Sequence, residues 1–127
     1  MDSAARGDLE YQIEISGLRL FAYHGVFPEE NTLGQEFKID LRLSVSHASS
    51  FENDRLDHVL SYWDALETVK NSFTNNTFKL LETAAESILN ALEVYPQIRH
   101  ARIHLKKLTP PIPVTVDYVG VVLEKRY

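Results

Sequence analysis

The sequence contains no cysteine, which excludes a disulfide framework, a thiolate metal site and a cysteine nucleophile. Basic residues are few, because 13 Lys and Arg stand against 18 Asp and Glu and give a formal net charge of −5. This balance argues against a duplex-DNA-binding protein, which needs a basic face. No apolar run approaches the ~18–20 residues of a membrane span, and the N-terminus carries no apolar signal segment. We therefore expect a cytoplasmic protein without a nucleic-acid or membrane partner.

The sequence also lacks a P-loop, a GxGxxG motif and a GxSxG motif, which argues against a Rossmann-type fold and a serine hydrolase. Its five histidines invite a search for a metal site, and His100 and His104 have the spacing of a helical zinc pair. They fall in an alternating pattern of strand type, where residues four apart are separated by about 13 Å. Because this pair cannot share one ion and the other histidines show no ligand spacing, we expect no metal site.

The 127 residues are 44% hydrophobic, which suits one compact domain with its own core. Residues 1–8 are small and polar, so we expect a flexible N-terminus followed by a single domain over residues 9–127. In the first predicted strand the apolar phase slips at Ser16 and Gly17, which indicates a β-bulge. Apolar alternation predicts four strands in all, near residues 9–20, 37–45, 101–105 and 119–123.

The segments between the strands have patterns of their own. Tyr23–Leu33 contains glycine, proline and asparagine and is predicted to be a loop. Ser61, with Asp64 three residues later, resembles the capping box of a first helix, and Thr77 is the expected N-cap of a second. The apolar stripe expected on the first helix consists of Tyr62, Leu66, Val69 and Phe73.

The order of the predicted elements is ββααββ. This order is typical of an α+β fold with a four-stranded, mostly antiparallel sheet and two helices on one face. An isolated copy would leave one sheet face and two edge strands uncovered, and natural proteins cover or pair such edges. We therefore expect an oligomer that joins sheets edge to edge.

Two adjacent lysines end the third predicted strand. Lys107 shares the phase of the buried apolar row, whereas Lys106 belongs to the solvated row. An ammonium at the mouth of an apolar face is partly desolvated and can act as a proton carrier. The structural alternative is that Lys107 only extends to water at the end of the strand.

Glu82 lies in the first turn of the second predicted helix. A helix N-terminus favours anions, so the residue either complements the helix dipole or serves a binding role. By pattern alone, Glu29 and Glu30 form a solvated charge pair and Tyr62 is a core aromatic residue.

Taken together, several short motifs resemble those of dihydroneopterin aldolase, and the likeness extends from about Ile13 to Glu124. No motif is specific alone, but all occur in the same order and spacing as in that family. The motifs are Tyr23-His24-Gly25, Glu29-Glu30-Asn31, Gly34-Gln35-x-Phe37, Leu60-Ser61-Tyr62, Leu80-Leu81-Glu82-x-x-Ala85-Glu86, Lys107-x-x-Pro110-Pro111-Ile112-Pro113 and Gly120-Val121.

The resemblance implies the tunnelling fold, in which subunits join their sheets into a barrel ring of four and two rings stack as an octamer. It also implies a retro-aldol cleavage of 7,8-dihydroneopterin in folate biosynthesis, giving 6-hydroxymethyl-7,8-dihydropterin and glycolaldehyde. The dihydropterin ring contains a C=N bond that can accept the electron pair of the broken bond. No cofactor, metal or lysine Schiff base is then needed, and the protein only places the ring and moves protons.

The same resemblance implies a role for each site residue. Glu82 would bind the amino group and N3–H of the pterin, and the backbone near Leu81 would bind the ring edge. Lys107 would mediate proton transfer, and Glu30 would hold the side-chain hydroxyls nearby. Tyr62, contributed by a neighbouring subunit, would stack on the ring and relay a proton.

Several alternatives remain open from the sequence. The Lys106–Lys107 pair permits an alignment slip of one residue, so that Lys106 would be the proton carrier. The same site could serve an epimerase acting at C2′ of dihydroneopterin or its triphosphate. A ring that binds pterins or purines without turnover is a third reading, and a zinc-dependent enzyme of the same fold would need a three-histidine site that the spacing does not provide.

Overall fold

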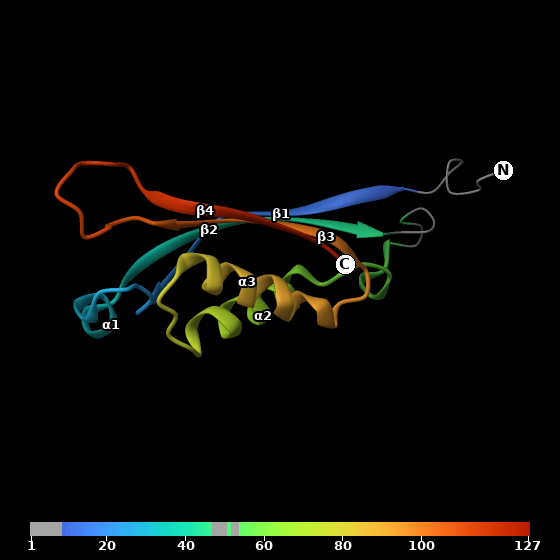
Figure 1. The fold of residues 1–127 in the computed structure, drawn as a ribbon. Helices are drawn as coiled ribbons and strands as arrows, with labels where there is room; N and C mark the ends of the chain where they lie inside the picture. Colours follow the sequence, from blue (N-terminus) through green and yellow to red (C-terminus); the bar gives the residue numbers. More distant parts are fainter. Residues whose placement is uncertain (1–8, 47–50, 52–53) are drawn as a thin grey trace.

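The computed structural model describes residues 9–46, 51 and 54–127 (Figure 1). The expected flexible segment 1–8 lies outside the described residues. The described chain forms one four-stranded sheet in the order β1-β2-β3-β4, and each neighbouring pair is antiparallel. The strands are β1 (Glu10–Ala22), β2 (Gln35–Ser46), β3 (Ile98–Lys107) and β4 (Val119–Arg126).

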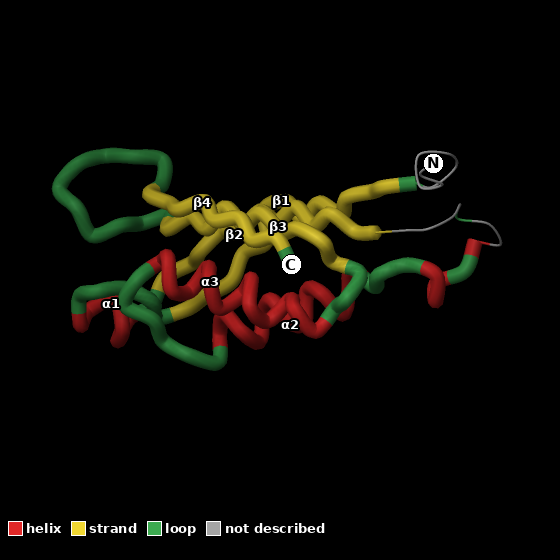
Figure 2. Tube along the Cα trace, turned by 45° about the vertical axis from the view of Figure 1, so that its right-hand side comes forward, coloured by secondary structure: helices red, strands yellow, loops and turns green. Residues whose placement is uncertain are grey.

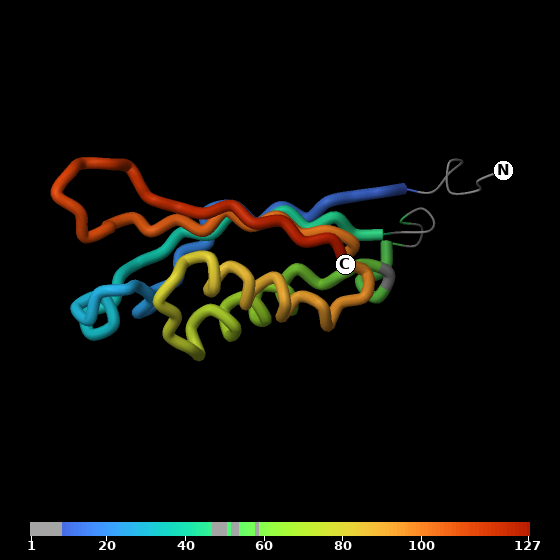
Figure 3. Tube along the Cα trace, viewed as in Figure 1, coloured from blue at the N-terminus to red at the C-terminus, as the bar shows by residue number. Residues whose placement is uncertain are grey.

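Two helices, α2 (Tyr62–Thr74) and α3 (Leu81–Ala91), cover one face of this sheet. Figures 2 and 3 show both helices on the same side, with the opposite face of the sheet uncovered. The predicted ββααββ order and the α+β class are therefore confirmed. Three short helices complete the described part of the chain: α1 (Pro28–Leu33), η3 (Leu56–His58) and η4 (Leu92–Val94).

The core lies between the sheet and the two helices. Alternate residues of β2 and β3 point toward the helices and are buried, as the period of two requires. The strand contribution to this layer includes Phe37, Ile39, Leu41, Leu43, Ala101, Ile103 and Leu105, and the helical contribution includes Ala65, Val69, Phe73, Ala84, Ala85, Ile88 and Leu89.

The β-bulge in the first strand is confirmed. The β1–β2 register shifts between Ile15 and Leu18, and Gly17 has a φ of 71°. The backbone N–H of Gly17 donates to the Asp40 carboxylate at 2.7 Å, which satisfies a group that the bulge removes from the ladder.

The first part of the Tyr23–Leu33 segment is a loop, but its second part is the helix α1 (Pro28–Leu33), so the prediction of a continuous loop was wrong. Pro28 stands in the first turn of this helix, where its missing N–H costs nothing. The Glu30 side chain also faces backwards to accept a hydrogen bond from the Phe27 N–H at 3.4 Å. A capping interaction of this kind can stabilise a turn that apolar periodicity does not reveal.

The N-cap prediction for α2 is confirmed, because the Asp64 N–H donates to Ser61 Oγ at 3.3 Å. The expected apolar stripe is only partly confirmed. Val69 and Phe73 are buried as expected, but Tyr62 is exposed and Ala65 is the buried residue at this end of the helix. The prediction of Thr77 as an N-cap was wrong, because α3 begins at Leu81. The Phe78 backbone, which precedes α3, is instead hydrogen-bonded to His24 and Gly25.

The two edge strands, β1 and β4, have no partner on their outer sides within the described chain. Among the described helices, none has the length and apolar character needed to cross a membrane. The uncovered sheet face carries charged and polar side chains of the solvated rows, including Asp40, Arg42, Arg102 and His104.

Candidate active site

A buried ion pair joins the end of β3 to α1. Lys107 Nζ lies 2.6 Å from Glu30 Oε2, and the two side chains are only 12% and 6% exposed. Lys107 thus ends the buried row, as its phase predicted. The interpretation of Glu29 and Glu30 as a solvated pair was wrong for Glu30, because α1 turns this carboxylate inward while Glu29 stays exposed.

Further groups hold the Glu30 carboxylate in place. Gln35 Nε2 donates to Glu30 Oε2 at 3.3 Å, and Thr109 Oγ1 donates to Gln35 Oε1 at 3.0 Å. Gly25 makes room for the carboxylate, because a Cβ at this position would lie 2.2 Å from Glu30 Oε2. With a φ of 151°, Gly25 also adopts a backbone conformation that other residues rarely take. The site therefore places a carboxylate and an ammonium in contact with little freedom to move.

Lys106 points to the opposite face of the sheet. Its Nζ lies 2.7 Å from Asp40 Oδ2 and 5.0 Å from the ring centre of Tyr118. The two neighbouring lysines are thus separated by the sheet, and only Lys107 faces the helices and Glu30. The position beside Glu30 therefore belongs to Lys107 and not to Lys106.

Leu81 and Glu82 lie in the first turn of α3, and Glu82 is exposed to solvent. The backbone three residues before this helix is attached to the loop that leads to α1, because the Gly25 N–H donates to the Phe78 carbonyl at 2.9 Å. The start of α3, α1 and the end of β3 consequently lie at the same end of the molecule (Figure 1). The structure thus brings Glu30 and Lys107 together and places the Leu81–Glu82 turn at their end of the fold.

Tyr62 lies at the other end of the helix layer. It is the first residue of α2 and 66% exposed, so the interpretation as a core aromatic residue was wrong. Phe73, near the end of α2, is the residue whose carbonyl contacts the site loop. Phe73 follows Tyr62 by eleven positions in this helix, which corresponds to a rise of about 16 Å. One chain therefore does not bring Tyr62 to the Glu30–Lys107 pair.

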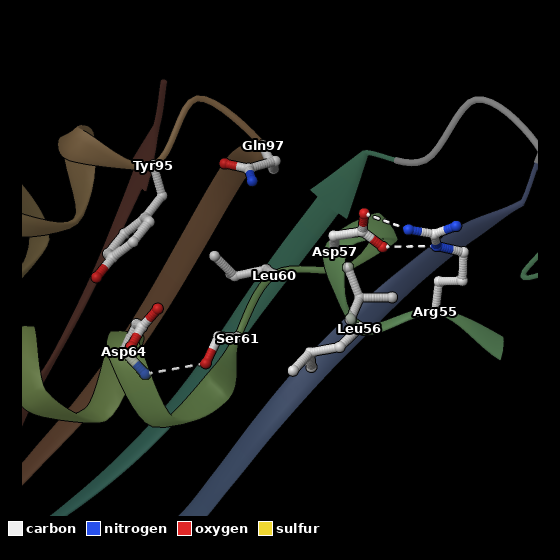
Figure 4. A pocket seen from close by; sticks show the side chains of 9 residues that line it. Arg55, Leu56, Asp57, Leu60, Ser61, Asp64, Tyr95 and Gln97 are labelled. Carbon is white, nitrogen blue, oxygen red and sulfur yellow. Dashed lines mark hydrogen bonds and ion pairs between the residues drawn. The ribbon is translucent and has the colours of Figure 1, made fainter.

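An open hollow of about 780 Å³ lies beside the start of α2 (Figure 4). Its lining includes Leu60, Ser61 and Asp64 from this end of the helix, and Tyr95 and Gln97 from the segment before β3. Tyr62 directly follows Ser61 and is exposed at this end of the helix. The residues that line the hollow do not include Glu30 or Lys107.

His24 is the residue of this region whose importance the sequence reading missed. Its side chain is fully buried, its Nδ1 accepts from the Phe78 N–H at 2.9 Å, and its Nε2 lies 2.8 Å from the Phe73 carbonyl. Because Nδ1 accepts and a carbonyl can only accept, the ring is neutral with its proton on Nε2. Burial lowers the pKa of His24 below its ordinary value of 6.5, the Phe73 hydrogen bond opposes this, and the Lys107 charge lowers it further. The available signal was the position of His24 beside Gly25 in a polar loop.

Within the described residues, no group of three or more His, Cys, Asp or Glu side chains could hold a metal ion. The two histidines that share a zinc-like spacing lie on β3 and contact different partners. His100 Nε2 lies 3.1 Å from Glu124 Oε1, and the His104 ring packs edge-on against Tyr118.

Comparisons with known proteins point to one family. The family model for dihydroneopterin aldolase (FolB) matches residues 13–124 of this chain. A dihydroneopterin aldolase of Streptococcus pyogenes is 34% identical over 116 residues, covering 91% of this chain and 98% of the relative. Dihydroneopterin aldolase 1 of Arabidopsis thaliana is 38% identical over 109 residues, covering 84% of this chain and 75% of the relative.

A solved structure indicates the same family. The crystal structure of Escherichia coli dihydroneopterin aldolase in complex with neopterin superposes with a TM-score of 0.80 at 27% identity. The match covers 91% of this chain and 98% of the other. The range matched by the family model includes Glu30 and Lys107, the residues that form the buried ion pair.

The ion pair leads to a prediction about stability. Removing one partner of a buried pair leaves an uncompensated charge and costs about 3–5 kcal/mol, whereas replacing both can be nearly neutral. We expect Glu30→Gln to lower the free energy of unfolding more than the double variant Glu30→Gln/Lys107→Met does. Urea denaturation of the wild type, both single variants and the double variant measures this. Additive effects of the two single changes would contradict the pairing.

His24 leads to a prediction about pH. Its pKa is lowered in the folded protein, so the unfolded chain binds the proton more readily and the free energy of unfolding falls as the pH drops below about 6.5. One such group contributes at most ~1.4 kcal/mol per pH unit. We expect His24→Phe to show a flatter dependence than the wild type between pH 7.5 and 5.5 in urea denaturation. Parallel dependences in the two proteins would exclude His24 as the titrating group.

Proposed function

Since the chain belongs to the dihydroneopterin aldolase family, its reaction is the retro-aldol cleavage of 7,8-dihydroneopterin in folate biosynthesis, and we propose that Lys107 and Glu30 carry it out. The products are 6-hydroxymethyl-7,8-dihydropterin and glycolaldehyde. The observation that supports this assignment is the contact of 2.6 Å between Lys107 Nζ and Glu30 Oε2 at the end of the fold where α3 begins.

The reaction needs a base, an acid and an electron sink. A base removes the proton of the 2′-hydroxyl, the C1′–C2′ bond breaks, and glycolaldehyde leaves as the C2′ carbonyl forms. The electron pair of the broken bond moves into the ring C=N, and an acid then delivers a proton to C1′. Because the substrate provides the sink, we propose that the reaction uses no cofactor, no metal and no Schiff base.

Lys107 is the proposed proton carrier, acting with an ordered water, and Glu30 is the proposed ligand of the substrate's side-chain hydroxyls. A hydroxyl that approaches Glu30 Oε2 is also next to Lys107 Nζ, because the two atoms are in contact. Gln35 supports this role, since its amide donates to the same carboxylate oxygen. The pair can thus hold a hydroxyl and exchange its proton without a large movement of either side chain.

Glu82 is the proposed anchor of the pterin ring, with the backbone near Leu81 binding the ring edge. A carboxylate fits the amino group and N3–H of a pterin, which are two donors side by side. Glu82 is exposed at the start of α3, so it is accessible to a ligand. The relative from Escherichia coli was crystallised with neopterin, which supports a small-molecule pterin as the ligand of this family site.

Tyr62 is proposed to act on a site of a neighbouring subunit, where it stacks on the ring and relays a proton. Its distance from the ion pair of its own chain supports this arrangement, as does the hollow lined by the preceding residue, Ser61. The free edges of β1 and β4 can pair with other copies. We therefore propose that four subunits form a ring and that two such rings stack as an octamer. Residues 9–127 are the proposed single domain of each subunit, and the proposed location is cytoplasmic.

A first prediction separates the two lysines. We expect Lys107→Ala to abolish cleavage while neopterin affinity changes by no more than about tenfold, or ~1.4 kcal/mol. Lys106→Ala is the matched control, since this side chain lies on the opposite sheet face, and it should keep most of the activity. Glu82→Ala should instead lose most of the pterin affinity. Glycolaldehyde release from 7,8-dihydroneopterin, followed by chromatography, and a binding titration with neopterin provide the measurements.

The outcomes distinguish the alternatives. 7,8-Dihydromonapterin as the sole product would replace the aldolase by an epimerase, in which the fragments recombine on the other face. Binding without any product would leave a pterin- or purine-binding ring. Unchanged turnover in Lys107→Ala would remove the proposed proton carrier, and intact binding in Glu82→Ala would place the pterin elsewhere.

A second prediction concerns the shared site. We expect Tyr62→Ala and Lys107→Ala to be inactive alone but to regain activity when they are unfolded together and refolded as mixed rings. In random mixtures, about one quarter of the sites then combine an intact Tyr62 with an intact Lys107 from different subunits. Mixtures that stay inactive while size-exclusion chromatography shows assembled rings would place both residues in the same subunit's site.

A further inference from the structure

Two consecutive residues, His24 and Gly25, bind both backbone polar groups of Phe78. The Phe78 N–H donates to His24 Nδ1 at 2.9 Å, and the Phe78 carbonyl accepts from the Gly25 N–H at 2.9 Å. Phe78 stands three residues before Leu81, the first residue of α3. The turn that leads into the proposed pterin-binding helix is therefore fixed by the loop that leads into α1.

The imidazole of His24 is enclosed by three phenylalanine rings. Its ring centre lies 4.5 Å from that of Phe73, 5.2 Å from that of Phe78 and 5.6 Å from that of Phe37. Phe37 is also the cross-strand partner of Lys107 in the β2–β3 ladder. His24 thus contacts, in one place, the end of α2, the approach to α3 and the strand pair that carries the proposed proton carrier.

The other residue of the pair connects the same turn to Glu30. The Gly25 backbone passes so close to Glu30 that a Cβ would meet its carboxylate. The Gly25 backbone is therefore a common neighbour of the Phe78 turn and of the Glu30 carboxylate. Among the described contacts, the charge that acts on His24 is that of Lys107, on β3, and Lys107 is itself paired with Glu30, on α1.

We propose that His24 is a positioning residue for pterin binding: its Nδ1 holds the Phe78 N–H and so sets where the Leu81–Glu82 turn stands relative to Glu30 and Lys107. This inference rests on the function proposed above. His24 itself is buried and touches no substrate, so its effect is on the placement of the ring and not on the transfer of a proton. The Phe73 hydrogen bond of Nε2 fixes the tautomer that leaves Nδ1 free to accept.

Two substitutions separate the hydrogen bonds of the imidazole. In His24→Asn, the amide oxygen stands close to the position of Nδ1 and can accept from Phe78, while the contact with the Phe73 carbonyl is lost. In His24→Gln, the amide nitrogen reaches toward the Phe73 carbonyl, while the Phe78 N–H is left without its acceptor. Both variants replace the ring by an amide, and they differ chiefly in which backbone group is satisfied.

The experiment measures neopterin affinity by titration and the kinetics of dihydroneopterin cleavage, with the wild type and both variants as full-length chains. We expect His24→Gln to weaken neopterin binding and to raise KM by about tenfold or more, because the turn that leads to Glu82 loses the hydrogen bond that holds it. His24→Asn should stay within roughly threefold of the wild type in both quantities. In both variants kcat should change less than KM, because Lys107 and Glu30 are unaltered.

Each other result overturns the inference. Equal affinities of the two variants, tighter binding by His24→Gln, or a fall in kcat with KM unchanged would show that His24 does not position the pterin turn. If neither variant folds, nitrogen NMR of the wild type decides, since His24 should be the Nε2–H tautomer and its Nδ1 signal should shift on addition of neopterin. A signal that stays unchanged at saturation overturns the inference. A wild-type protein that binds no neopterin would instead refute the proposed function.

Discussion

The contact between Lys107 and Glu30 is the constraint around which this end of the molecule is organised. A carboxylate and an ammonium that are withdrawn from water must be paired and hydrogen-bonded, or folding loses several kcal/mol. The fold meets this requirement from three directions: the phase of β3 turns Lys107 toward the helices, α1 turns Glu30 inward, and Gln35 donates to the carboxylate. Gly25 is the backbone position that makes the approach sterically possible.

The fold brings Lys107 and Glu30 together, but it keeps Tyr62 away from this pair. A helix is a rigid spacer, and the length of α2 keeps the tyrosine at the far end of the helix layer. If Tyr62 acts on the proposed site, it must therefore come from another copy of the chain. In the proposed ring, the outer edges of β1 and β4, which have no partner within the described chain, would pair with other copies, and the same assembly would give the exposed Tyr62 a site to act on.

Local patterns predicted most of the fold and one half of the ion pair. The phase slip at Gly17, the cap at Ser61 and the inward phase of Lys107 all depend on neighbours in sequence, and all are present. Features that depend on distant residues were missed or wrongly predicted. Glu30 read as solvated because its partner is 77 residues away, and the start of α3 was placed too early because a distant histidine binds the Phe78 backbone.

The wrong predictions for Glu30 and for the start of α3 both arise from contacts between residues that are distant in sequence. Such contacts also bear on the proposed chemistry. When the substrate carries its own electron sink, the protein mainly needs to position the substrate and needs few reactive groups of its own. In the proposed function, long-range contacts between the backbone and buried polar side chains would provide this placement, such as those of His24 with Phe78 and Phe73. Such contacts leave little trace in periodicity or composition, because each involves a single residue in a loop. The parts of the site that the sequence concealed are therefore those that fix geometry, while the groups proposed to meet the substrate were visible from their motifs.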